Sequence, residues 1–136
     1  MKTYNLFISH SWAHSDNYQK LESLLRKRSY FEFKDYSVPK NDPIHTNGTD
    51  RQLYDAILRK MQPCSVILIL AGVYSTYSKW IEKEIKIAKE EFSVQKPIIA
   101  IEPRGSERTS QIIKNNADRI VGWNTNSVVD AIRALA

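Results

Sequence analysis

The chain has 136 residues, of which 42% are hydrophobic and 26% are charged, and these values are ordinary for one globular domain. Its formal charge is +5, but the basic residues are scattered, so charge alone does not indicate a nucleic-acid-binding protein. The longest apolar run, VILILAGV at residues 66–73, is far shorter than the ~20 residues that cross a membrane, and the first residues lack the apolar segment of a signal peptide. We therefore expect one cytoplasmic domain over residues 1–136, without a membrane or nucleic-acid partner.

The first part of the chain alternates between apolar runs and an amphipathic segment. Residues 3–9 (TYNLFIS) form a short apolar run that predicts a buried strand, and Ser15 or Asp16 can cap the helix that follows. Residues 30–36 (YFEFKDY) alternate between apolar and polar side chains, which predicts a second strand. Residues 37–48 contain two prolines and an Asn-Gly pair, so we expect a loop there.

The middle of the chain predicts a helix and then the most apolar strand. Thr49 or Asp50 can cap the helix, and Pro63 ends it. Residues 64–71 (CSVILILA) are continuously apolar, as in a strand that is buried on both faces. The single cysteine, Cys64, excludes an internal disulfide, fits a reducing compartment, and is expected to pack in the core at the start of this strand.

The last part continues the alternation of helices and strands. After a loop at 72–78 (GVYSTYS), a third helix contains the sequence SKWIEKEI. The remaining predicted elements are a strand at 96–102, a short helix at 110–115, a brief strand at 118–123 and a closing helix at 127–136. Apolar strands separated by helices indicate a parallel sheet covered on both faces. We therefore expect an α/β fold with a flavodoxin-like, doubly wound, five-stranded sheet in the order 2-1-3-4-5.

Glu84 departs from the pattern of the third helix. The helix face that should pack on the core consists of Ile81, Ile85, Ala88 and Phe92. Glu84 lies at the edge of this apolar stripe, beside Trp80, and no cation stands three or four residues away. It is a candidate functional carboxylate; the alternative is an ordinary exposed glutamate, because glutamate is a good helix former.

The predicted topology locates a binding crevice. In open α/β sheets, ligands bind at the carboxyl ends of the strands where the strand order reverses, which here is between the first and third strands. The helix that carries Glu84 starts from the same edge of the sheet. The expected lining consists of Ser9, His10, Ser11, Trp12, the loop after Gly72 and the loop at 37–48.

Several familiar sites are missing from the sequence. There is no GxGxxG and no GxxxxGK[ST], so neither a dinucleotide fingerprint nor a P-loop is expected. A phosphate-accepting receiver domain would need an aspartate where this chain has Leu70-Ala71 and acidic residues where it has Ser9-His10. The three histidines lack the spacing of zinc ligands, so we expect no metal.

Three features together resemble a TIR domain: FISHSW at the end of the first strand, the proline-bearing loop after the second, and Trp80-x-x-x-Glu84 on the third helix. More narrowly, the chain is similar over nearly its whole length to the short TIR-like proteins of prokaryotic Thoeris antiphage defence. The resemblance implies that Glu84 is the catalytic residue of an NAD glycohydrolase or ADP-ribosyl cyclase, with NAD as substrate and no separate cofactor. It further implies a cyclic product that activates a separate effector protein, and a site that neighbouring copies of the domain help to complete.

The same resemblance implies a nucleotide pocket lined by first-strand and second-loop residues. Trp80 would shield Glu84 from water, and the aromatic side chains of Trp12, Tyr36 and Tyr74 could stack on the flat rings of the substrate. The expected substrate-binding set is Phe7, Ser9, His10, Ser11, Trp12, Tyr36, Ser37, Tyr74 and Trp80.

One carboxylate is chemically sufficient for this reaction. Ordinary glycosidases use two, one of which protonates the leaving oxygen. Nicotinamide instead leaves NAD as a neutral molecule from a cationic pyridinium, so no acid is required. A carboxylate that holds the ribose and stabilises the developing oxocarbenium ion is enough. Attack by water gives ADP-ribose, whereas attack by a group on the same molecule gives a cyclic nucleotide.

The chain also departs from the family pattern. Ile81 replaces the cysteine of the common Trp-Cys-x-x-Glu motif, and the loop at 37–48 lacks the Arg-Asp-x-x-Pro-Gly signature of animal and plant TIR domains. Three classes of function therefore stay open: an NAD-consuming enzyme, a non-catalytic module that assembles with copies of itself or with a partner, and a related enzyme that transfers glycosyl groups between nucleosides.

Overall fold

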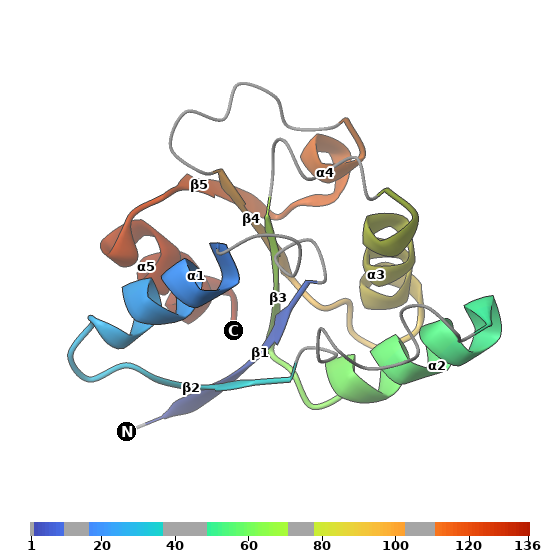
Figure 1. Cartoon of the computed structure of the whole chain (residues 1–136), viewed down its shortest axis with the longest axis horizontal. Coiled ribbons are helices and arrows are strands. Elements are labelled where there is room, and N and C mark those ends of the chain that lie inside the picture. Colours follow the sequence, from blue (N-terminus) through green and yellow to red (C-terminus); the bar gives the residue numbers. More distant parts are fainter. Residues whose placement is uncertain (1, 10–16, 37–48, 71–77, 103–110) are drawn as a thin grey trace.

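The computed structural model describes residues 2–9, 17–36, 49–70, 78–102 and 111–136 (Figure 1). The strands are β1 (Thr3–Ile8), β2 (Glu32–Asp35), β3 (Val66–Leu70), β4 (Ile98–Glu102) and β5 (Arg119–Gly122). The helices are α1 (Asn17–Arg26), α2 (Asp50–Met61), α3 (Ser78–Glu90), α4 (Gln111–Asn116) and α5 (Thr125–Leu135). All neighbouring strands pair in parallel, in the order β2-β1-β3-β4-β5, which confirms the predicted α/β topology.

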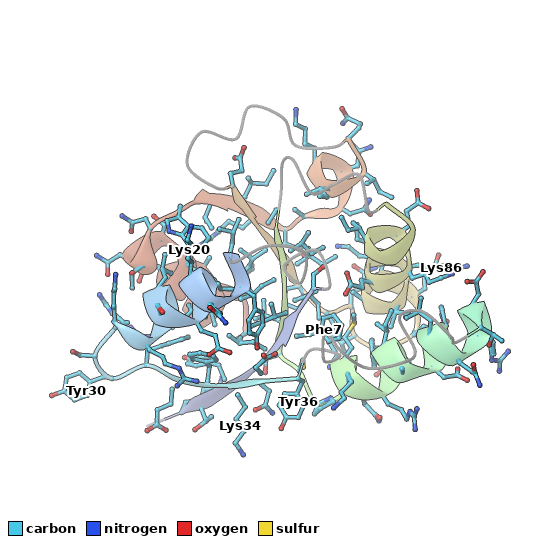
Figure 2. All side chains as sticks on the ribbon, in the orientation of Figure 1. Phe7, Lys20, Tyr30, Lys34, Tyr36 and Lys86 are labelled. Atoms are coloured by element: carbon cyan, nitrogen blue, oxygen red, sulfur yellow. The ribbon has the colours of Figure 1, made fainter. Side chains whose placement is uncertain are left out.

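The sheet is buried on both faces, so successive side chains of a strand enter two different cores. Helices α1 and α5 cover one face, and α2, α3 and the short α4 cover the other (Figure 1). On β1, Leu6 and Ile8 belong to the core under α1 and α5, and Phe7 belongs to the core under α2 and α3. We call these the α1/α5 core and the α2/α3 core. Figure 2 shows Phe7 between β1 and the pair α2 and α3.

Helix α2 begins with the capping arrangement that its sequence predicts. Thr49 is the N-cap: its side-chain oxygen accepts from the backbone N–H of Gln52 at 3.1 Å. The Gln52 side chain in turn accepts from the backbone N–H of Thr49 at 2.9 Å. At the other end, the ammonium group of Lys96 donates to the backbone carbonyls of Gln62 and Cys64 at 2.9 and 2.8 Å. Both ends of α2 are thereby supplied with hydrogen-bond partners.

Two predicted boundaries shift for physical reasons. The strand expected from residue 30 begins at Glu32, because Tyr30 has a φ of 60° and cannot join an extended strand. Helix α3 ends at Glu90, so Phe92 lies beyond it, although Phe92 still packs against the α2/α3 core. The apolar pattern located both segments correctly but did not fix where the strand begins or where the helix ends.

Cys64 is buried next to β3, as predicted. Its thiol donates to the backbone carbonyl of Lys60 at 3.3 Å. Burial raises the pKa of the Cys64 thiol to about 12, so this cysteine is a packing residue and not a nucleophile. Among the described helices, none combines the length and apolar character that crossing a membrane requires.

Candidate active site

Ser9 is held in place at the carboxyl end of β1. Its backbone N–H donates to the carbonyl of Leu68 on β3 at 2.9 Å, which extends the pairing of the two strands by one residue. Because side chains alternate along a strand, Ser9 points to the same face as Phe7, toward α2 and α3. The backbone of β1 and its pairing with β3 therefore determine where the Ser9 hydroxyl lies.

Glu84 lies in the second turn of α3 and faces the interior. Its side chain is 1% exposed, and Ile81, Ile85 and Ala88 are buried around it on the same helix. Glu82, two residues earlier, is exposed. The interpretation of Glu84 as an ordinary surface residue is therefore wrong: this carboxylate replaces an apolar side chain on the packing face of the helix.

Ser9 and Glu84 meet directly. The Ser9 hydroxyl donates to Oε1 of Glu84 at 2.6 Å, a short distance that is typical of a hydroxyl bonded to a carboxylate. Ser9 is 2% exposed, and among the residues that the structure describes these two are the only buried polar side chains. A buried carboxylate is costly unless donors compensate for its lost hydration, and the serine supplies one such donor.

The pair lies at the point where the strand order reverses. β1 and β3 are neighbours in the sheet, yet α1 after β1 covers one face, whereas α3 after β3 covers the other. Crevices form at such points because the two connections diverge. The structure thus brings Ser9 and Glu84 together at the edge where the topology predicts a ligand site.

Two further predicted site residues lie on the same side of the sheet. Phe7 is 1% exposed and packs in the α2/α3 core below Ser9. Tyr36 directly follows β2, where its backbone N–H donates to the carbonyl of Leu6 at 2.9 Å, and its half-buried ring packs against the same core. Phe7 thus forms the apolar floor of this region, and Tyr36 lies closer to its edge.

The other predicted residues fall outside the part of the chain that the structure describes. Trp80 belongs to the first turn of α3, but its side chain is outside the described part. The predicted residues in the undescribed segments are His10, Ser11, Trp12, Ser37 and Tyr74. Their roles stay predictions.

Grooves elsewhere on the described surface do not belong to this site. Two adjoining grooves lie between α1 and the start of α5, on the other side of the sheet from Glu84. Their lining includes Lys20, Lys27, Arg28, Trp123, Thr125 and Arg133. Within the described ranges, no group of three histidine, cysteine or acidic side chains could hold a metal ion.

The sequence predicts Ser9 and Glu84 as site residues but does not predict the contact between them. The two residues are 75 positions apart in the sequence. The family resemblance implies separate roles for them, substrate binding for Ser9 and catalysis for Glu84. The nearness of the two residues could have been anticipated from the directions of their side chains. Ser9 is two residues after Phe7 and so points to the same face of the sheet, and Glu84 shares a helix face with Ile81 and Ile85. Both side chains were therefore directed into the same layer between the sheet and α3.

Comparison with known protein families adds an independent observation. Residues 7–108 match the family model described as Thoeris protein ThsB, TIR-like domain. The match includes the end of β1 and the whole of β3 and α3, and hence both members of the Ser9–Glu84 pair. A comparison with curated proteins gives no match. Because the family match spans well over half of the chain and agrees with the observed fold, the chain belongs to the Thoeris ThsB family of TIR-like domains, whose role is in antiphage defence.

Proposed function

We propose that this domain cleaves the bond between nicotinamide and ribose in NAD, with Glu84 as the catalytic residue. The observation that carries the proposal is the burial of the Glu84 carboxylate on the packing face of α3, at the reversal point of the sheet. A buried carboxylate lowers folding stability relative to an apolar side chain, so its presence favours a chemical role. Membership of a TIR-like family supports the same assignment.

The chemistry requires little beyond a well-placed negative charge. As the C1′–N bond breaks, its electron pair moves to the pyridinium nitrogen, and nicotinamide departs as a neutral molecule. Positive charge then develops on C1′ and the ring oxygen of the ribose. The carboxylate of Glu84 stabilises this charge and accepts hydrogen bonds from the ribose hydroxyls; its effect is large because the surrounding isoleucines exclude water.

The nucleophile determines the product. Water that attacks C1′ loses a proton and gives linear ADP-ribose, whereas a hydroxyl or ring nitrogen of the same molecule closes a cyclic nucleotide. We propose the cyclic product as a signal that activates a separate effector protein in the cytoplasm. Assembly of several copies of the domain to complete the pocket belongs to the same proposal.

The proposal assigns different tasks to different residues of the pocket. Tyr36, at the exposed margin of the α2/α3 core, would stack on a flat ring of NAD, as would Trp12 and Tyr74. His10, Ser11 and Ser37 would contact the polar parts of the substrate. Trp80, one turn before Glu84 on α3, would limit the access of water to the carboxylate.

The test is nicotinamide release from NAD by purified protein, measured over a range of protein concentrations so that assembly is allowed. Glu84→Gln keeps the shape of the side chain but removes the charge, so we expect the rate to fall at least ~100-fold. Glu82→Gln is the matched control, since it makes the same change at an exposed position of the same helix and should leave the rate unchanged. Release by Glu84→Gln at the wild-type rate would contradict the proposal, as would a wild type without release at every concentration.

A further inference from the structure

The hydroxyl of Ser9, directly after β1, and the carboxylate of Glu84 on α3 form the one buried polar contact between two described side chains of this protein. We propose that Ser9 is a positioning residue that holds the Glu84 carboxylate in its reactive orientation, and that Ser9 acts through Glu84 without itself contacting the substrate. The inference rests on the proposed function and gives Ser9 a role different from the substrate binding that the sequence suggested.

Ser9 is held in place by the sheet. Its side chain has one rotatable bond between heavy atoms, and its backbone N–H donates to the carbonyl of Leu68 at 2.9 Å, so the backbone determines where the hydroxyl lies. The preceding residues, Phe7 and Ile8, are buried on opposite faces, so the end of β1 cannot rotate without disturbing both cores.

Glu84, in contrast, needs an external constraint. Its carboxylate is separated from the helix backbone by three rotatable bonds, and the buried side chains beside it on α3, Ile81 and Ile85, have no polar atom that could orient it. The 2.6 Å hydrogen bond from Ser9 ties Oε1 to the end of β1 and thereby restrains the direction of the side chain. Glu84 is thus held by two rigid elements, α3 and β1.

The hydrogen bond of Ser9 argues for positioning over binding. A serine hydroxyl has one proton to donate, and Ser9 donates it to Glu84. A residue that touches substrate mainly changes KM, whereas a residue that orients the catalytic group mainly changes kcat. A displacement of about 1 Å at a reacting group can cost ~100-fold in rate, so loss of this bond should be readily measurable.

The experiment compares Ser9→Ala and Ser9→Thr with wild type in NAD cleavage, at a temperature at which circular dichroism shows each protein to be folded. We expect Ser9→Ala to lower kcat about 10- to 100-fold with KM changed less than about twofold, because substrate binding is retained but the carboxylate is misplaced. Ser9→Thr keeps the hydroxyl and should recover most of kcat. Ser65→Ala is the matched control: it removes a hydroxyl just before β3, at the opposite edge of the sheet, and should change neither constant.

Three results would overturn the proposal: an increase in KM with unchanged kcat, which means substrate binding; wild-type kinetics in Ser9→Ala; and equal losses in Ser9→Ala and Ser9→Thr. Melting temperatures test the pair independently of activity. Ser9→Ala should lower the melting temperature in the wild-type background but much less in a Glu84→Ala background, since the bond is then already lost. A wild type without NAD cleavage would refute the proposed function, whereas equal melting shifts in both backgrounds would refute the Ser9–Glu84 coupling.

Discussion

At the scale of single residues, Glu84 and Tyr30 both depart from the usual preferences of their residue types, Glu84 in the interior and Tyr30 on the surface. Glu84 puts a carboxylate where α3 otherwise carries isoleucine and alanine, and it lies in the interior beside Ser9. Tyr30 puts a large ring at the periphery of the molecule, 82% exposed, on a backbone with φ of 60° (Figure 2). Residues that violate local preference mark either function or strain. Under the proposed function Glu84 belongs to the first category, and the backbone of Tyr30 places it in the second.

Replacing Tyr30 with glycine should therefore stabilise the protein. A Cβ in the left-handed region costs about 1 kcal/mol, and the exposed ring contributes little burial in return. The carbonyl of Tyr30 accepts from the Arg133 guanidinium at 3.0 Å, a backbone contact that glycine preserves. We expect Tyr30→Gly to raise the free energy of unfolding by up to about 1 kcal/mol in urea denaturation. Tyr30→Ala, which keeps the Cβ, is the control; an equal or larger gain in Tyr30→Ala would show that the strain is not the cause.

Single residues also set the limit of what the sequence could predict about the site. Glu84 could be identified as a candidate from its place at the edge of an apolar stripe, because helical periodicity fixes which residues share a face. Its contact with Ser9 could not be predicted, because it depends on how far α3 lies above the sheet and on which rotamers the side chains adopt. Periodicity gives directions, whereas a distance of 2.6 Å requires tertiary packing.

At the scale of elements, α2 shows how a helix start can be read from a short pattern. Thr49 and Gln52 exchange hydrogen bonds with each other's backbone N–H groups. We expect Thr49→Ala to lower the free energy of unfolding by about 1 kcal/mol, because the N–H of Gln52 loses its acceptor. Thr49→Ser retains the oxygen and should lose much less. Equal destabilisation by the two variants in chemical denaturation would mean that the threonine methyl group, and not the cap, is what matters.

The elements themselves were predictable to different degrees. β3 and β4 could be identified because β3 and the first four residues of β4 are apolar without interruption, as is typical of buried parallel strands. The ends of helices and strands were harder to predict. The start of β2 depends on the backbone angle of Tyr30, and the end of α3 at Glu90 is not signalled by the apolar pattern, which continues to Phe92. Boundaries depend on a few local torsions, whereas the identity of an element depends on many side chains.

At the scale of the whole molecule, β3 contributes buried side chains to both cores. Ile67 packs in the α2/α3 core and Leu68 in the α1/α5 core, and both are fully buried. We expect Ile67→Ala and Leu68→Ala each to lower the free energy of unfolding by about 2–5 kcal/mol, in a single transition seen by both fluorescence and circular dichroism. Val94→Ala, at a position that is 78% exposed, is the control and should change it by less than about 0.5 kcal/mol. Separate transitions for the two core variants would show that the cores unfold independently.

The topology of the whole chain was predictable because few arrangements are allowed. Alternating strands and helices demand right-handed crossovers, and with five strands this leaves few ways to cover both faces of a sheet. The observed order follows one of the two common solutions. The shape of the pocket is not fixed by such rules, since it depends on connecting segments whose sequences carry no periodicity.

The α1/α5 core joins elements that lie far apart in the sequence. Val128, Val129 and Ile132 of α5 pack in the same cluster as Leu6 and Ile8 of β1. Because β1 is translated well before α5, its side chains in this core are covered only in part, by α1, until α5 has been made. Partly folded chains with exposed apolar side chains of this kind are prone to aggregate and are recognised by chaperones. The nascent domain therefore stays exposed to aggregation until α5 packs on the sheet.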